Sequence, residues 1–413
     1  MWLYLKKSNS NFGILLITIL IFFVLIELFY IGYYVIYKKS ESIYFVGINA
    51  LDTDKDNNYV TVGSNNNNDN HYEKAMVSMY NSKKEKTFEK LYNVGYNSAF
   101  FGVLIDGENI VAIGSYEKTK TDHQESIRRA LIVKYDKEGN IIFEKDYGIL
   151  DNSKFTGIVK VGDDYIVTGQ SVYKNTRIGS EKGGAILVKF DKDGNLLWDK
   201  TYGNVKESVF NDIIISNNYL YVIGNYEDYY AMIVKYDLDG NIVSFNDYKI
   251  TDELGFSSIV SVDDYIYVSG SLKTGAHDTD AMIVKYDLDC EYIDQVSYSG
   301  IGKERFNRLI VDDYKNLIAI GTMMSKASHS GKTYGDYNYD GIIAKYNTDL
   351  KNVDLVSYGD ERNDFFTDVK SINDNYLVVG YSSYEDGSYM SKFISYSSAL
   401  KVLGVEWYEN NFS

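Results

Sequence analysis

The sequence has no proline, one cysteine and four histidines in 413 residues. Its lone cysteine, Cys290, cannot form a disulfide within the chain, so thiols do not indicate a redox compartment. No two histidines have the spacing of a metal-binding helix, and neither a G-x-S-x-G motif nor a phosphate-binding loop occurs. These absences remove the usual signatures of metalloproteases, serine hydrolases and nucleotide-binding enzymes, and we expect no catalytic residues and no cofactor.

Basic residues are fewer than acidic ones, 42 against 58, and the formal net charge is −16. So acidic a chain repels phosphate backbones, which argues against a nucleic-acid partner. Tyrosine is abundant instead, with 41 residues. Together with frequent Asn, Lys and Ile and the lack of proline, this composition is typical of an AT-rich coding sequence.

A long apolar run covers residues 12–37 and contains no Lys or Arg. It exceeds the roughly 20 residues that cross a bilayer core, and no small-x-small cleavage site follows it. We therefore expect a short tail at 1–11, a single transmembrane signal anchor at 12–37 and a linker at 38–42. Lysines flank the run on both sides, but the short tail favours a cytoplasmic N-terminus. This predicts a single-pass cell-membrane protein whose large domain is extracytoplasmic.

One block recurs seven times in the rest of the chain. A tyrosine follows each block 17 residues after its first residue, and a phenylalanine follows six of these tyrosines eight residues later. A strand ending in glycine comes next, as in YIVTG at 165–169. The seven blocks are AMVSMYN at 75, ALIVKYD at 130, AILVKFD at 185, AMIVKYD at 231 and 281, GIIAKYN at 341 and SKFISYS at 391.

Each repeat therefore contains four short strands, which we name a (with the Phe), b (ending in Gly), c (the block) and d (ending in Tyr). Repeats of this length predict an all-β fold, a seven-bladed β-propeller of four-stranded antiparallel blades over 43–413. We expect residues 43–63 to pair with 391–408 in the last blade and so close the ring. The lysine in each block should pack its stem between blades.

The sequence WDKTYG at 198–203, followed by VFNDIIIS and LYVIGN, resembles a repeat of bacterial surface propellers. Units of that repeat read W-x-K-x-Y-G-G and then G-Y-I-V-A-G, and the strand order is similar to that of quinoprotein-like propellers. The resemblance implies the fold for nearly the whole body and implies no single activity. One cysteine and three tryptophans do not fit the cofactor site of quinone-dependent members.

The b–c connections vary from 7 to 20 residues, whereas the other spacings are almost fixed. All b–c loops must emerge on one face of the propeller, and loops that vary on a rigid scaffold commonly bind partners. We therefore expect a binding surface for a protein or a glycan there. The candidate residues are Tyr226, Tyr229, Tyr230, His277, His329, Lys332, Tyr334, Tyr337 and Tyr339.

A second candidate is the acidic a–b turn DTDKDNN, with Asp52, Asp54, Asp56 and Asn58. Alternating carboxylates suit a hard cation, but Gly63 stands where a calcium loop needs its final glutamate. An acidic turn without metal is the better interpretation. Cys290 replaces a turn glycine, and we expect its side chain to be exposed.

These features favour a non-enzymatic, membrane-anchored binding or scaffold propeller with its partner on the b–c loop face. The alternative is a carbohydrate-active enzyme, a glycosidase or lyase, with two carboxylates on that same face. A structural head whose function lies in the membrane helix and its Glu27 is a third possibility.

Overall fold

The computed structural model describes residues 46–66, 72–92, 94–118, 127–148, 152–175, 180–202, 208–226, 230–248, 254–275, 278–326, 337–359, 362–383 and 389–407. The chain divides into two compact units, 1–44 and 45–413, and every described residue belongs to the second. The expected tail, transmembrane helix and linker therefore lie outside the described residues. Within the ranges above, no helix has the length and apolarity to cross a membrane.

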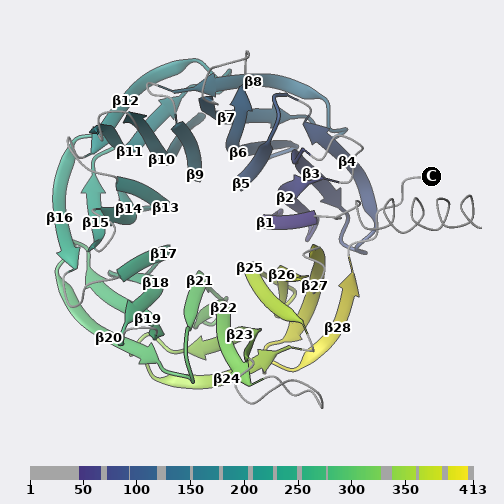
Figure 1. Ribbon diagram of the computed structural model, residues 1–413, viewed down its shortest axis with the longest axis vertical. Helices are drawn as coiled ribbons and strands as arrows, with labels where there is room; N and C mark the ends of the chain where they lie inside the picture. Colours follow the sequence, from purple (N-terminus) through teal and green to yellow (C-terminus); the bar gives the residue numbers. More distant parts are fainter. Residues whose placement is uncertain are drawn as a thin grey trace, which may run out of the picture. The chain divides into compact units, whose positions relative to one another are not determined.

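The second unit is an all-β propeller of four-stranded antiparallel groups, as the repeat predicts. The described strands form five sheets of four strands and one sheet of eight. The first strand of each group lies nearest the centre of the ring and the fourth lies on its rim (Figure 1). A single parallel bridge, between Arg128 and Asn152, joins the two halves of the eight-stranded sheet.

The strand bounds follow the chain. The first sheet has β1 (Val46–Thr53), β2 (Tyr59–Asn65), β3 (Lys74–Tyr80) and β4 (Lys86–Tyr92). The eight-stranded sheet has β5 (Ser98–Asp106), β6 (Asn109–Lys118), β7 (Ile127–Tyr135), β8 (Ile141–Tyr147), β9 (Asn152–Val161), β10 (Asp164–Asn175), β11 (Ser180–Phe190) and β12 (Leu196–Tyr202). The third sheet has β13 (Ser208–Ser216), β14 (Tyr219–Tyr226), β15 (Tyr230–Tyr236) and β16 (Ile242–Tyr248).

The remaining three sheets complete the ring. The fourth has β17 (Leu254–Val262), β18 (Tyr265–Lys273), β19 (Thr279–Asp287) and β20 (Tyr292–Tyr298). The fifth has β21 (Arg305–Val311), β22 (Leu317–Lys326), β23 (Tyr337–Tyr346) and β24 (Asn352–Tyr358). The sixth has β25 (Asn363–Ile372), β26 (Asn375–Ser383), β27 (Tyr389–Ser397) and β28 (Val402–Trp407).

The repeated aromatic residues form the core between neighbouring groups. Phe100 is fully buried, and its ring lies 6.1 Å from Tyr92 of the preceding group and 6.4 Å from Tyr135 of its own. Phe210 makes the same two contacts, with Tyr202 at 5.7 Å and Tyr236 at 6.3 Å. Edge-to-face rings at these distances stabilise beyond their burial. The fixed spacing from Tyr to Phe is thus a packing requirement.

The recurring lysines contact the next group, as expected. The Lys235 ammonium lies 2.9 Å from Asp289, and the Lys285 ammonium donates to the Thr348 carbonyl oxygen at 3.1 Å. Lys134 is buried and donates to the Tyr165 hydroxyl at 2.8 Å. Their apolar stems follow strand c, and their charged ends hold neighbouring groups together.

The expected closure of the ring is wrong. Strands β1 and β2 pair with β3 and β4, and β25 to β28 form their own sheet, so residues 43–63 and 391–408 share no sheet. Side chains join the two ends instead. The Thr367 hydroxyl donates to the Ile48 carbonyl oxygen at 2.7 Å, and the Asp368 carboxylate accepts from the Leu51 amide at 2.8 Å.

This joint reuses a contact found around the inner ring. The residue after the repeated Phe donates its side chain to the inner strand of the next group. In the first group Ile48 takes the place of the Phe, and Asn49 donates to the Phe100 carbonyl oxygen at 2.8 Å. Thr156 and Asn211 do the same to Phe210 and Phe256, both at 2.6 Å. The last group therefore meets the first through the same kind of hydrogen bond that links its neighbours.

Candidate functional site

A pocket of about 440 Å³ opens among the last three sheets. Its residues come from the ends of β18, β22 and β26, the starts of β19, β21, β23 and β25, and the segment before β21. These are the strand ends that lead into or out of b–c and d–a connections. The pocket therefore lies on the b–c loop face, and its volume falls in the range of about 300–1,000 Å³ typical of ligand sites.

A row of aromatic rings forms one wall of this pocket. The ring of Phe365 on β25 lies 5.7 Å from Tyr339 on β23 and 5.1 Å from Tyr381 on β26, with tilts of 30° and 28°. Tyr389 extends the row by an edge contact with Tyr381 at 5.4 Å. The rings offer an apolar surface with hydroxyl groups at its margin.

Arg305 contributes positive charge to the pocket, which Lys303 also lines. Its Nε and Nη2 atoms both donate to the Ser257 hydroxyl oxygen, at 3.1 and 2.8 Å. Surrounding protein atoms desolvate the guanidinium and lower the pKa of Arg305, although water still reaches the side chain. An exposed yet crowded position is typical of a side chain in a concave site.

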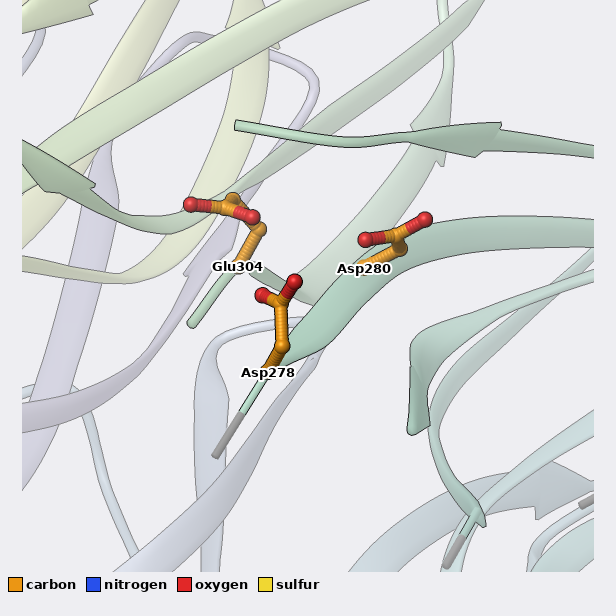
Figure 2. Close-up of side chains that lie close together, drawn as sticks. All are labelled: Asp278, Asp280 and Glu304. Carbon is orange, nitrogen blue, oxygen red and sulfur yellow. The ribbon is translucent and has the colours of Figure 1, made fainter. Parts of the chain in front are cut away.

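Three carboxylates gather beside the pocket, on Asp278, Asp280 and Glu304, with oxygen atoms all within 4.8 Å of one another (Figure 2). Two backbone hydrogen bonds fix this geometry, from Thr279 to the Gly302 carbonyl oxygen at 3.3 Å and from Glu304 to the Thr279 carbonyl oxygen at 2.7 Å. Oxygen-only clusters of this kind are the chemistry that hard cations bind.

Glu304 is the most buried member of the cluster, with 1% exposure. Its oxygens accept from the Gly300 amide at 2.9 Å and the Gly302 amide at 3.3 Å. Burial raises the pKa of Glu304, the charge of Asp278 adds to the rise, and the amide hydrogen bonds oppose it. The carboxyl group is thus anchored in the loop before β21.

A chain of charges runs along the inner strands below this face. The Arg308 guanidinium lies 3.0 Å from Asp212 on β13 and 3.1 Å from Asp368 on β25. Asp212 also accepts from the Ser258 hydroxyl at 3.0 Å. These contacts tie β13, β17, β21 and β25 together around the ring centre, which is a structural role.

The structure places the predicted binding residues in three groups. Tyr339 lines the pocket, whereas Tyr337, which is 52% exposed, does not. Tyr226 and Tyr230 contact each other at 5.3 Å, and Tyr226 donates to Asp247 at 2.9 Å, away from the pocket. The others lie outside the described residues, namely Tyr229, His277, His329, Lys332 and Tyr334.

The acidic turn does not bring its candidate ligands together. Asp54 accepts from the Asp56 and Asn58 amides, both at 2.9 Å, and from the Asn58 side chain at 2.8 Å. Asp52 instead binds Lys370 at 2.9 Å and accepts from the Ile105 amide at 2.8 Å. The turn also borders a pocket of about 700 Å³ on the opposite face. Polar residues of this turn and of the neighbouring β5–β6 turn, such as Asp54, Asp56 and Glu108, line it.

Sequence reasoning missed Arg305, Phe365, Tyr381 and the Glu304 cluster. A signal for the cluster exists within the repeat. Two residues before the repeated Phe, earlier groups have Ser98, Ser153 and Ser208, whereas the last two have Glu304 and Asp364. Asp364 forms a fully buried ion pair with Lys392, which replaces an apolar residue of the block.

No protein-family model matches the sequence, and no curated protein matches it. Solved structures resemble it at low identity. A prolyl endopeptidase is 10% identical with a TM-score of 0.49, over 88% of this chain and 56% of that one. The propeller domain of the trilobed protease from Pyrococcus furiosus is 11% identical, with a TM-score of 0.38 over 75% and 95% of the two chains. A Synechocystis apocarotenoid oxygenase variant is 10% identical, with a TM-score of 0.40 over 81% and 87%. At these identities the likeness concerns the fold alone.

Proposed function

We propose that the chain is a membrane-anchored, non-enzymatic binding or scaffold propeller that holds a protein or glycan partner on its b–c loop face. In this proposal each half of the eight-stranded sheet counts as one blade, so the propeller has seven. Residues 12–37 anchor it in the cell membrane, with the propeller outside the cytoplasm. The repeat belongs with those of the bacterial surface propellers that WDKTYG resembles.

The observation that carries the proposal is the pocket on that face, with its aromatic row beside Arg305. Aromatic rings and arginine are the residues that contribute most to recognition sites, since both give large contact areas with polar ends. The row is built on strands β23, β25 and β26, so its geometry does not depend on loop conformation.

A carbohydrate-active enzyme remains the second candidate, and the carboxylate cluster is the observation in its favour. A buried glutamate whose pKa is raised, beside a second carboxylate, is the arrangement of a general acid. We rank this second because both Glu304 oxygens accept backbone amides, which leaves the carboxyl group poorly placed to give a proton to a bound sugar.

The test is binding of the full chain, purified in detergent, to a glycan array and to proteins from a bacterial surface extract. The double variant Tyr339→Ala/Tyr381→Ala removes most of the aromatic wall. The control is Tyr314→Ala, because Tyr314 is 65% exposed in the turn between β21 and β22, on the opposite face.

Binding that the double variant loses and Tyr314→Ala keeps would support a recognition face at the pocket. If the wild-type chain binds nothing, or both variants bind alike, the proposal fails. Hydrolysis of a bound glycan, abolished by Glu304→Gln, would establish the enzyme instead.

A further inference from the structure

The guanidinium of Arg305 has no carboxylate partner among the described residues. Other arginines do have such partners. Arg308, three residues after Arg305, lies between Asp212 and Asp368, and the surface residue Arg128 pairs with Glu117 at 3.0 Å. Arg305 contacts only the Ser257 hydroxyl, through two of its donors. Arg305 also lines the pocket, and its remaining donors form no hydrogen bond with the described residues. A planar fork of free donors is the group that binds a carboxylate in two parallel hydrogen bonds.

The absence of an internal partner matters because the protein is strongly acidic. With a net charge of −16, carboxylates are plentiful, yet none neutralises Arg305 in the described structure. The neighbouring Lys303 also lines the pocket and is exposed, and no ion pair is formed by it there. Lys303 and Arg305 therefore bring two cations to the pocket, on either side in sequence of the buried Glu304, which lines it as well.

The nearby acidic cluster is the main opposing charge. Hydrogen bonds within the protein offset part of the repulsion between this cluster and a bound carboxylate. The Glu304 oxygens accept from the Gly300 and Gly302 amides, and an Asp280 oxygen accepts from the Thr274 hydroxyl at 3.3 Å. Glu304 alternates with Lys303 and Arg305 along the segment, with 1% exposure against exposed neighbours. Glu304 also lines the pocket, and both of its carboxylate oxygens accept hydrogen bonds from amides of the loop.

The second half of the recognition chemistry is the aromatic row. Tyr339, Phe365 and Tyr381 present apolar ring surface, and no hydrogen bond occupies the hydroxyl groups of Tyr339 and Tyr381 in the described part. A ligand with one apolar face, several hydroxyl groups and a carboxylate would use all of these groups together. A small acid would leave the rings unused, and a neutral sugar would leave Arg305 unpaired.

We propose that this pocket binds a carboxylate-bearing pyranose, such as a uronic acid unit within a glycan, with its carboxylate on Arg305 and its apolar face on the ring row. The inference rests on the proposed function, in which this face is a binding face, and names the ligand class. An acidic peptide is the competing source of a carboxylate, but it lacks the flat apolar face that matches three adjacent rings.

The experiment is calorimetric titration of the full chain in detergent with trigalacturonic acid, its fully methyl-esterified form and a short polyglutamate peptide. The ester keeps the sugar rings and removes the charge. Three variants are compared with wild type: Arg305→Gln, Phe365→Ala and the control Arg128→Gln, which removes a charge from the same face outside the pocket. Circular dichroism melting verifies that each variant is folded.

We expect wild type to bind the acid at least about tenfold more tightly than the ester, since hydrogen bonds to charged groups are the stronger kind. Arg305→Gln should lose that preference, Phe365→Ala should weaken both sugars, and Arg128→Gln should change neither. Equal binding of acid and ester, retained by Arg305→Gln, would overturn the inference while leaving a sugar-binding face intact. Preference for polyglutamate, or no binding of any probe, would also overturn it, and protein capture from the surface extract would then decide the proposed function separately.

Discussion

The eight-stranded sheet β5–β12 and the three sheets β17–β28 repeat the same pattern but fill two of its positions differently. At the c–d turn, the first region has Gly139 and Gly194, whereas the second has Cys290, Leu350 and Leu400, all with positive φ. Two residues after the repeated Phe, the first has Gly102 and Gly157, and the second has Ser258, Arg308 and Asp368.

The turn position shows how each solution works. A Cβ atom on Gly194 would lie 2.7 Å from the ring of Phe143 in the preceding group, so the ring needs the glycine. For Cys290, Leu350 and Leu400, the equivalent residue of the preceding group is Ser244, Asp294 or Asp354 in place of the ring, and the turn residue itself fills the space. Cys290 is therefore 1% exposed, and the expectation of an exposed cysteine was wrong.

The comparison teaches that residues larger than glycine, some of them charged, replace the repeat's glycines in β17–β28. The pocket that Arg305 lines lies in this same region. Positive φ at leucine costs about 1–2 kcal/mol of conformational energy. The buried charge of Asp368, which pairs with the partly exposed Arg308, brings a desolvation penalty as well. Deviations of this kind from an otherwise regular pattern are expected near functional sites.

The largest effect is expected from Arg308→Met, which removes the charge that distinguishes the inner ring of the second region. Asp212 and Asp368 would remain without their partner, and we expect a loss of about 3 kcal/mol in the free energy of unfolding at neutral pH. Burial raises the pKa of Asp368, and Arg308 opposes that rise. Without Arg308 the pKa rises further, so stability falls as pH increases above the unfolded pKa of about 4.

Denaturant titration at about pH 3 and pH 7 tests this, because the carboxyl group is largely protonated in both states at the lower value. The matched control is Arg128→Met, an exposed pair partner, with an expected change below about 0.5 kcal/mol. An equal loss for Arg308→Met at both pH values would mean that packing, and not charge, is its contribution.

The next effect concerns the turn of the first region. Gly194→Leu places a side chain against the Phe143 ring and holds leucine at a φ of 79°. Overpacking and backbone strain together should cost about 2–3 kcal/mol in unfolding free energy. The double variant Phe143→Asp/Gly194→Leu recreates the combination of Asp294 and Leu350, and should recover at least half of the loss. Additive losses in this double-mutant cycle would show that the two positions are independent.

The reverse exchange should cost less. Leu350→Gly removes a side chain that is 6% exposed and belongs to the apolar cluster against which Val296 and Leu355 pack, but it also relieves the positive φ of 59°. Loss of a buried leucine costs about 2–5 kcal/mol, and relief of the backbone returns about 1–2 kcal/mol. The free energy of unfolding, measured by thermal denaturation, should therefore fall by about 1–2 kcal/mol. Lys84→Gly at the exposed counterpart should not destabilise, since no buried side chain is lost there.

Much of the fold could be predicted from the sequence, because the repeat is local. The fixed distance between Tyr and Phe predicted strands that the structure confirms, and the turn glycines Gly139, Gly194 and Gly240 have positive φ. The closure was wrong although seven complete sets of strands can be counted in order. Side-chain hydrogen bonds join the two ends, among them the one from Thr367 to Ile48, 319 residues apart. Asn49 forms the equivalent hydrogen bond to the second group, so this contact by itself does not identify where the ring closes.

The candidate site was predicted only in part. The b–c loop face and Tyr339 came from loop lengths and composition, which are properties of single segments. Arg305, Phe365 and Tyr381 belong to three different strands, and their convergence depends on how sheets sit side by side. The acidic replacements at Glu304 and Asp364 were visible within the repeat, where comparison with the equivalent serines would have pointed to this region.

The smallest expected effect on stability concerns Cys290, which occupies the turn position that Gly139 and Gly194 occupy in the first region. Burial raises the pKa of Cys290 to about 11, against an ordinary thiol value near 8.5. The thiol is therefore protonated in the folded protein, and its contribution to stability declines as pH rises from about 8.5 toward 11, because only the unfolded chain ionises there. Maleimide should label the native protein at pH 8 far more slowly than the urea-unfolded chain, with little change in the unfolding midpoint for Cys290→Gly. Rapid labelling of the native protein would mean that the turn at Cys290 opens, and that burial does not protect the side chain at this position.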